Sequence, residues 1–237
     1  MIRNKIYIKK ELEIAGFTVW VVDGKYIREN LDEDFNNFGQ HYRFKFIPKK
    51  ELWIDKEHSG GEGEKIFFIN SMLTMDRFLS AGISHKKASE IANVLEKEER
   101  AKSAYFKKYF KSKSVLKSKS NQIKKIHKRL LKKYTYGKLN VWIVDGELVR
   151  GLYFVDFTQG GHYKVYKFIP ENEVWIDDDV SSKERKFVLL HEIHEMNLMK
   201  KGLKYDPAHQ SSNAIEFYAR SHRRKIDKLL RKELQKS

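Results

Sequence analysis

The order of hydrophobic and polar positions is the same in two halves of the chain. Residues 17–28 read FTVWVVDGKYIR, and residues 139–150 read LNVWIVDGELVR. A longer pair follows, because GQHYRFKFIPKKELWID ends at Asp55 and GGHYKVYKFIPENEVWID ends at Asp177. Matches of this length predict an internal repeat, in which one structural unit occurs twice.

Short apolar runs in each copy predict four strands. Apolar residues alternate around Asp23-Gly24 and Asp145-Gly146, and Asp-Gly is a typical tight-turn pair, so each of these stretches predicts a β-hairpin. The runs RFKFIP and ELWID, like YKVYKFIP and EVWID, predict a second hairpin in each copy. Each copy is therefore expected to begin with four strands.

After the strands, the pattern changes to helical spacing. EKIFFINSMLTMDRFLSAGI and SSKERKFVLLHEIHEMNLMKKGL each predict a helix, with Gly82 and Gly202 as C-terminal stops. SHKKASEIANVLEKEE and DPAHQSSNAIEFYARSHRRKIDKLLRKEL predict a second helix, and in the latter Asp206 is expected as the cap and Pro207 at the first helical position. The expected fold class is α+β, a tandem repeat of a ββββαα unit.

This repeat predicts three regions. The first copy is expected over residues 1–96 as a structural unit, the second over residues 137–237, and a basic helical linker over residues 97–136 with a Lys/Ser-rich break near 111–121. The apolar residues of the linker recur at helical spacing. They are Ile123, Ile126, Leu130 and Tyr134.

Composition narrows the class of protein. Hydrophobic residues at 41% and aromatic residues at 13% are typical of a folded chain. The absence of cysteine excludes disulfides, thiol nucleophiles and Cys-based zinc sites, so any metal must be held by His and carboxylates. No stretch resembles a signal peptide or reaches the roughly 18 apolar residues of a membrane span. We therefore expect a cytoplasmic protein without a transmembrane segment.

The formal charge of +16 is concentrated in two segments. Residues 97–136 carry +13 and residues 220–237 carry +6, which leaves −3 for the remainder. Both segments could bind nucleic acid through its phosphates, and four aromatic residues between the lysines could stack on bases. A solvated basic face is the alternative interpretation, and the sequence leaves both open. The four aromatic residues are Tyr105, Phe106, Tyr109 and Phe110.

Candidate chemistry lies in HEIHE, residues 191–195. The surrounding helix is apolar almost all round and is therefore expected to be buried, where ionisable groups are costly unless they are paired or bind metal. In the first copy, Asn70, Ser71, Leu73 and Thr74 stand opposite His191, Glu192, His194 and Glu195. Because His194 faces a leucine, we expect it to have a packing or supporting role. The other three replace neutral polar residues, as expected of a functional site.

The following helix carries two further candidates. His209 falls opposite Ser89 and Glu216 opposite Glu96, and both share one helical face. Two helices joined by a short turn pack antiparallel, which could bring these side chains towards His191 and Glu195. The predicted metal ligands are His191, Glu195, His209 and Glu216.

The residues 172–218 resemble the zincin metallopeptidases of the gluzincin type, whose motif is His-Glu-x-x-His followed by a Glu on a later helix. The resemblance implies that His191 and Glu216 bind zinc, that Glu192 is the general base for a metal-bound water, and that the substrate is a peptide or protein. It also implies an edge strand before the active-site helix, for which ELWID or EVWID is suited. Glu195 stands where the family has its second His, which favours harder metals such as Mn or Fe, and His209 could supply the missing nitrogen.

Other interpretations stay open. His191 and Glu195 could form a buried pair without metal, while Glu192 and Glu195 meet nearby Lys or Arg side chains at the helix edge. We expect His41 and His162, which occur in both copies, to have a role in the fold, and the acidic run 177–179 to cap the helix that follows. The leading hypothesis is a metal-dependent hydrolase. The alternative is a non-enzymatic nucleic-acid-binding or assembly protein whose site has decayed.

Overall fold

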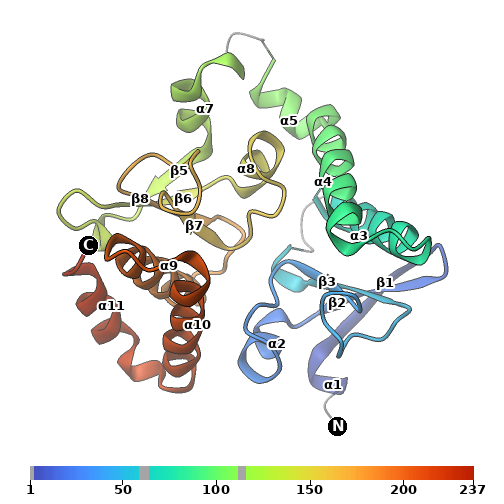
Figure 1. Cartoon of the computed structure of the whole chain (residues 1–237), viewed down its shortest axis with the longest axis horizontal. Coiled ribbons are helices and arrows are strands. Elements are labelled where there is room, and N and C mark those ends of the chain that lie inside the picture. The colour runs from blue at the N-terminus through green and yellow to red at the C-terminus, as the bar shows by residue number, and fades with distance from the viewer. Residues whose placement is uncertain (1–2, 59–63, 112–115) are drawn as a thin grey trace. The chain divides into compact units, whose positions relative to one another are not determined.

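The computed structural model describes residues 3–58, 64–111 and 116–237 (Figure 1). The chain forms two compact units, the first of residues 1–117 with 150–156 and the second of residues 118–149 with 157–237. Each unit is a mixed α+β structure with one four-stranded sheet. The segment 97–136, expected as a separate linker, divides between the two units.

Both sheets have the same topology. The first has the order β1-β2-β4-β3 and the second β5-β6-β8-β7. In each sheet the two central strands are parallel, and both edge strands are antiparallel to their neighbours. The strands are β1 (Tyr7–Ile14), β2 (Phe17–Val22), β3 (Phe38–Gln40), β4 (Glu51–Asp55), β5 (His127–Leu130), β6 (Asn140–Val144), β7 (Gly160–His162) and β8 (Glu173–Asp177).

The hairpins predicted at the two Asp-Gly pairs are wrong, because each pair begins a helix. Asp23 Oδ1 accepts a hydrogen bond from the Tyr26 N–H at 3.0 Å, and Asp145 Oδ1 accepts one from the Leu148 N–H at 3.0 Å. This is the N-cap geometry that Asp favours. The helices are α2 (Gly24–Asn30) and α8 (Gly146–Leu152). Each copy is therefore ββαββαα rather than ββββαα.

The second predicted hairpin is also different. Its first strand is only three residues long and precedes the predicted one, while residues 41–50 form successive turns such as Phe44 N–H to Gln40 O at 3.0 Å. Phe44 and Ile47 are buried but Phe46 is exposed, so the apparent alternation in RFKFIP was misleading. ELWID (β4) and EVWID (β8) are interior strands, so the expectation that one is an edge strand is wrong.

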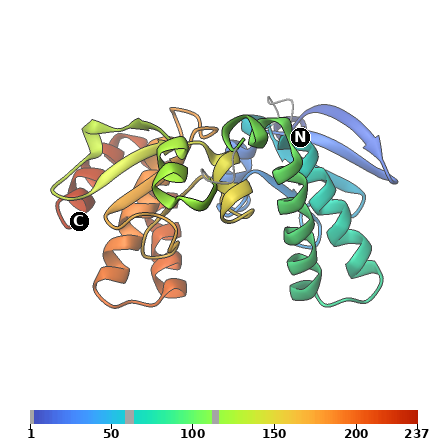
Figure 2. The same ribbon diagram turned by 90° about the horizontal axis from the view of Figure 1, so that it is seen from above.

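Each unit carries a pair of long helices, as the helical spacing predicted. Figure 2 shows each pair lying side by side. The turn between the helices contains Gly82 at φ +81° or Gly202 at φ +94°, a backbone conformation that favours glycine, so the predicted stops are confirmed. The helices are α3 (Glu64–Ser80), α4 (His85–Lys102), α9 (Arg185–Lys200) and α10 (Tyr205–Ser221).

The basic segments differ from the prediction in several details. The last helix is separate, because α10 ends at Ser221 and α11 begins at Ile226, and the residue before α10 is Lys204 rather than an Asp206 cap. Residues 127–130 form a strand of the second sheet, although their apolar spacing predicted a helix. Part of the predicted break, 112–115, lies outside the described residues. The remaining elements are α1 (Arg3–Ile6), η1 (Lys56–His58), α5 (Ala104–Tyr109), α7 (Lys119–Ile126), η2 (Lys132–Tyr134), η3 (Arg223–Lys225) and α11 (Ile226–Leu234).

The long helices cover one face of each sheet. In the first unit, Val19, Leu52 and Ile54 pack against Ile69 and Met72 of α3. In the second unit, the corresponding face packs against α9, which is covered in turn by α10 and α11. Within the described part of the chain, no helix has the length and hydropathy that crossing a bilayer requires.

A short segment of the second repeat completes the first unit. Arg150 is fully buried there, and its Nη2 donates to Glu64 Oε2 at 2.8 Å while its Nε also donates to Glu64. Arg100 Nη1 donates to the same carboxylate at 2.8 Å, and Asn93 Nδ2 donates to Asp156 at 2.9 Å. The core of the first unit therefore includes residues from both sequence repeats.

Candidate metal centre

The HEIHE sequence lies on α9, whose apolar residues pack against the second sheet and α11. Leu189, Leu190 and Ile193 are at most 1% exposed. The ionisable residues share this burial, because His191 is 9% exposed and Glu195 is 3% exposed. The sequence prediction of a buried helix is confirmed, and its polar groups require partners.

Three potential metal-ligand atoms converge between α9 and α10. His191 Nε2 lies 3.2 Å from His209 Nδ1, which lies 2.8 Å from Glu195 Oε2. Glu195 Oε2 lies 3.7 Å from His191 Nε2, since the two residues are one turn apart on the same helix face. Together these three atoms form a group that could hold a metal ion.

The two α9 residues of this group are oriented by other buried side chains. Glu216 Oε2 lies 3.0 Å from His191 Nδ1, and His162 Nε2 lies 3.0 Å from Glu195 Oε1. The Lys164 N–H donates to His162 Nδ1 at 3.2 Å, so the proton of the neutral ring is on Nε2 and donates to Glu195. Glu216 thus holds the Nδ1 side of His191 and leaves Nε2 facing the group, and His162 holds Oε1 of Glu195 and leaves Oε2 facing it.

A buried ion pair supports Glu216 from behind. Arg220 Nη2 donates to Glu216 Oε1 at 2.7 Å, and its Nη1 donates to Glu184 Oε2 at 2.5 Å. Burial by itself would raise the pKa of Glu216, but the hydrogen bond with His191 and the charge of Arg220 lower it to about 2. Glu216 is therefore an anion that fixes both His191 and Arg220.

The cluster favours the charged forms of His191 and Glu195 when no metal is bound. Burial opposes the charged form of His191, yet the nearby Glu195 carboxylate and the hydrogen bond to Glu216 raise its pKa well above the ordinary value. Burial also opposes the charged form of Glu195, but hydrogen bonds from His162, His191 and His209 hold its pKa far below the usual range. Metal binding must therefore displace a proton from the His191 imidazole.

Glu192 lies beside the group on the side of β7. Its carboxylate is close enough to a ring nitrogen of His162 and to the Glu195 carboxylate to form a second three-residue group, and Glu192 is half-buried. Burial, reinforced by the charges of Glu195 and Glu216, raises the pKa of Glu192 to about 8. A Cβ on Gly160 would lie 3.3 Å from Glu192 Cγ and 2.9 Å from the Trp175 carbonyl oxygen, so this glycine makes room for Glu192.

The predicted site residues are therefore brought together, with one difference of position. Glu216, predicted as a ligand, lies at the Nδ1 side of His191 and outside the three converging atoms. His194 faces away from them, because its Nε2 lies 3.0 Å from Ser211 Oγ and its Nδ1 lies 3.3 Å from Glu233. Glu233 is on α11, so His194 links three helices of the second unit.

His162 is the residue that the sequence assigned to the fold alone. That assignment paired His162 with His41, but the strand register pairs Gly161 with Trp175 and Gly39 with Trp53, which places His162 opposite Gln40. His41 instead lies 2.8 Å from the Ile47 carbonyl oxygen through its Nδ1. An alignment anchored on the tryptophans would have separated the two histidines.

The acidic run 177–179 has mainly structural contacts. Asp177 Oδ1 accepts from the Asp179 N–H at 3.1 Å, and Asp178 Oδ1 accepts from the Gly146 N–H at 3.1 Å. Asp178 also forms an ion pair with Lys128 at 2.5 Å. Asp178 therefore meets the start of α8, and the expectation that this run caps the helix after it is wrong.

The basic segments expose charge over packed apolar faces. On α11, Ile226, Leu230 and Leu234 belong to the core of the second unit, whereas Lys228, Arg231 and Lys232 are exposed. Of the four aromatic residues proposed to stack on bases, two are buried. They are Phe106 and Phe110, at 8% and 5% exposure.

Comparisons of the chain with protein-family models, with curated proteins and with solved structures find no match. The geometry of the second unit is therefore the main basis for a functional hypothesis.

Proposed function

We propose that the second unit is a metal-dependent hydrolase that holds one divalent ion, with zinc as the first candidate. His191 Nε2, Glu195 Oε2 and His209 Nδ1 are the proposed ligands. The observation that carries this proposal is the convergence of these three atoms from two helices at separations of 2.8, 3.2 and 3.7 Å. In tetrahedral zinc sites, ligands at about 2.1 Å from the ion are about 3.4 Å apart, so these separations suit such an ion.

The residues around the ligands also fit a metal. Ligating histidines commonly donate their second nitrogen to a carboxylate, as His191 Nδ1 does to Glu216, and ligating carboxylates commonly accept a further hydrogen bond, as Glu195 does from His162. We therefore assign Glu216 an orienting role in place of the ligand role that the gluzincin resemblance implied. Two nitrogens and one oxygen suit zinc, and the carboxylate leaves Mn or Fe as alternatives.

Glu192 is the proposed proton carrier. A divalent ion in such a site supplies a Lewis acid that polarises a carbonyl and makes water more acidic. Glu192 follows a ligand directly on the same helix and lies in the Glu195 and His162 group. A divalent cation beside it would favour its carboxylate over the protonated form that a pKa of about 8 implies, and the carboxylate is placed to accept a proton and to return it to a leaving amine. The proposed substrate is a peptide or protein, as the resemblance implies.

The first test is the metal content of the full chain, purified without chelator and without a histidine tag. Elemental mass spectrometry is expected to find about one divalent ion per wild-type chain, and almost none in His191→Ala. Asn70→Ala is the matched control, because Asn70 occupies the same helix position in the first unit and should keep the ion. A metal-free wild type, or metal retained in His191→Ala, would contradict the proposal.

The second test separates catalysis from binding. Glu192→Gln is expected to keep the metal but to lower turnover of a fluorescence-quenched peptide library by about 100- to 10,000-fold, since the amide cannot accept a proton. Ser71→Ala, at the matched position of the first unit, should change neither quantity. Full activity in Glu192→Gln would show that Glu192 is not the base.

The exposed basic face of α11 supports a second candidate function, nucleic-acid binding. If this face binds phosphates, replacing Lys228, Arg231 and Lys232 with Gln should weaken binding of a DNA duplex and make its salt dependence shallower by about 0.9 per lost phosphate contact. Three exposed lysines of the first unit, replaced together, provide the matched control. They are Lys45, Lys49 and Lys50. Equal binding by both triple variants would argue against this face.

A further inference from the structure

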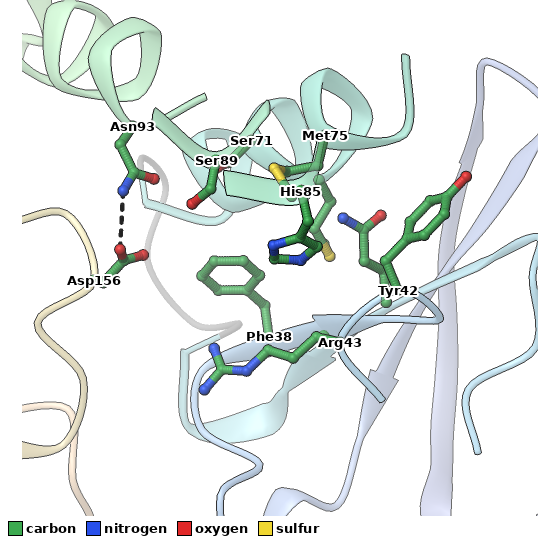
Figure 3. A pocket seen from close by; sticks show the side chains of 12 residues that line it. Phe38, Tyr42, Arg43, Ser71, Met75, His85, Ser89, Asn93 and Asp156 are labelled. Carbon is green, nitrogen blue, oxygen red and sulfur yellow. Dashed lines mark hydrogen bonds between the residues drawn. The ribbon is translucent and has the colours of Figure 1, made fainter. Parts of the chain in front are cut away.

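The first unit has a cavity of about 390 Å³ at the position that corresponds to the cluster of the second unit (Figure 3). Gln40, Ser71 and Ser89 line it, and they are the counterparts of His162, Glu192 and His209. The volume lies within the range of roughly 300–1,000 Å³ typical of small-molecule sites. The ionisable cluster is therefore replaced by open space rather than by a filled core.

One wall of the cavity is apolar. Phe38, Met72 and Met75 line it, and the Phe38 ring is held by stacking on Phe68 with centroids 4.6 Å apart and an angle of 21°. Methionine side chains are flexible and polarisable, so they adapt to apolar groups of different shape. This wall suits an aliphatic or aromatic side chain.

The polar side of the cavity favours an anion. Arg43 and His85 line it and are exposed, and Figure 3 shows both side chains near the Phe38 ring. The Arg43 guanidinium lies 5.1 Å from the Phe44 ring centroid, and within the described residues no carboxylate forms an ion pair with it. The lining carboxylate, Asp156, already accepts from Asn93. Arg43 thus offers its N–H groups to a ligand.

The amide of Gln40 adds a neutral polar group. Gln40 is 7% exposed, and none of the described side chains forms a hydrogen bond with its amide. An amide that lines a cavity can form hydrogen bonds with whatever fills it, since it has both donor and acceptor atoms. The amide can accept from or donate to a peptide group.

We infer that this cavity binds an apolar residue that carries a free carboxylate. Phe38, Met72 and Met75 receive the side chain, Arg43 and His85 bind the carboxylate, and Gln40 contacts the amide of the ligand. Such a ligand is either an N-acylated amino acid or the C-terminal residue of a peptide. The inference does not depend on metal or hydrolysis in the second unit.

The test uses the full chain labelled with ¹³C at the methionine methyl groups. Of the five Met residues, Met72 and Met75 report on the cavity, while Met196 and Met199 report on the second unit. Titration with N-acetylphenylalanine should shift the first pair saturably and leave the second pair unchanged. N-acetylphenylalanine amide, which lacks the carboxylate, should bind at least tenfold more weakly.

Two variants identify the anion site. Arg43→Met is expected to weaken binding of N-acetylphenylalanine at least tenfold, and His85→Ala to weaken it by a smaller factor. Arg77→Met is the matched control, because Arg77 is an exposed arginine of α3 that does not line the cavity, and it should bind like wild type. Wild-type dispersion of the Met72 and Met75 signals in the ligand-free variants verifies that the first unit is folded.

The inference is overturned if the acid and the amide bind equally, if Arg43→Met binds like wild type, or if Met72 and Met75 do not respond at millimolar ligand. A response confined to Met196 and Met199 overturns it as well. A tripeptide ending in Phe then identifies the source of the ligand. Tighter binding of the tripeptide indicates a peptide C-terminus, and equal binding indicates a free acylated amino acid.

Discussion

The two units share one topology, and six matched positions around the cluster show how they differ. Five of the six change from a neutral polar residue to an ionisable one, and only the glutamate of the second long helix is kept. The pairs, first unit before second, are Gln40 and His162, Asn70 and His191, Ser71 and Glu192, Thr74 and Glu195, Ser89 and His209, and Glu96 and Glu216. The difference is therefore chemical and leaves the framework intact.

The retained pair shows which residues the framework itself needs. Arg100 Nε donates to Glu96 at 2.8 Å, as Arg220 Nε does to Glu216 at 2.9 Å, and each arginine also binds a glutamate at the start of the preceding helix. A buried ion pair that occurs with and without the histidines cannot exist only to serve them. Glu216 is thus a structural residue, because its Oε1 binds Arg220. Its Oε2 is the atom that binds His191.

A compensated exchange distinguishes the cavity of the first unit from the cluster of the second. The second unit has Gly160 on the strand and Glu192 on the helix, a small residue beside a large one. The first unit has Phe38 on the strand and Ser71 on the helix, so the large residue is on the strand instead. The Phe38 ring lies against Phe68 in the first unit. This exchange favours a first unit adapted to another ligand over one that merely lost its ligands.

The largest expected effect concerns the shared ion pair. Arg220→Met should destabilise the second unit by about 3–5 kcal/mol, because it removes the cation that faces two buried carboxylates. Arg100→Met should lower the free energy of unfolding of the first unit by a smaller amount, since Arg150 still donates to Glu64 there. Denaturant titration followed by the methionine methyl signals resolves the two units. Equal losses would mean that Arg150 does not compensate.

The next effect tests a proposed metal ligand by replacing it with the residue at the matched position of the first unit. His209→Ser places the first unit's residue in the second unit and is expected to lower zinc affinity by at least about 100-fold, measured by competition with a chelator. Ser89→Ala, its matched control, should have no effect. An unchanged affinity in His209→Ser would remove His209 from the ligand set.

Acid should separate the two units in the metal-free protein. The pKa of Glu216 is lowered from 4.5 to about 2, so its stabilisation is complete above pH 4.5 and is lost as the pH falls towards 2. Burial raises the pKa of Glu96, so protonation of Glu96 does not lower the stability of the first unit over this pH range. The Met196 and Met199 signals should therefore lose native dispersion at a higher pH than those of Met72 and Met75. The reverse order would contradict the assigned directions.

The smallest effect concerns the space beside Glu192. Gly160→Ala should lower peptide turnover about tenfold with metal content unchanged, because the added Cβ lies 2.9 Å from the Trp175 carbonyl oxygen and 3.3 Å from Glu192 Cγ, so that β7 shifts against β8 and moves the carboxylate. Activity and metal content are measured on the same sample. Loss of metal together with activity would indicate instead that the substitution disturbs the whole cluster.

Much of the framework could be predicted from the sequence. The long helices were predictable because their apolar residues recur at helical spacing and end at Gly82 and Gly202. The strand order was not, because Asp-Gly suits both a hairpin and a helix start, and only the tertiary structure decides between them. The parallel central strands require a crossover, which the helix after Asp23 or Asp145 begins.

The candidate site was predictable in its members more than in their roles. Comparison of the repeats selected His191, Glu195 and His209 correctly as neighbours, since each has a neutral counterpart. Glu216 faces the Nδ1 side of His191, and this depends on how α10 is rotated about its axis. The spacing of apolar residues in the sequence does not fix that rotation to within one residue. His162 was missed because the sequence comparison aligned the His-Tyr pairs of the two copies. The correct alignment follows the strand register, which depends on hydrogen bonds between distant residues.

The exchange of residues 150–156 between repeats has a consequence for synthesis. Proteins tend to fold from the N-terminus as the ribosome releases them. Here the first unit lacks Arg150 and Asp156 until the first strands of the second repeat have also emerged, so Glu64 must wait for one of its two arginine partners. The two repeats are successive in the gene, but their maturation on the ribosome is interleaved.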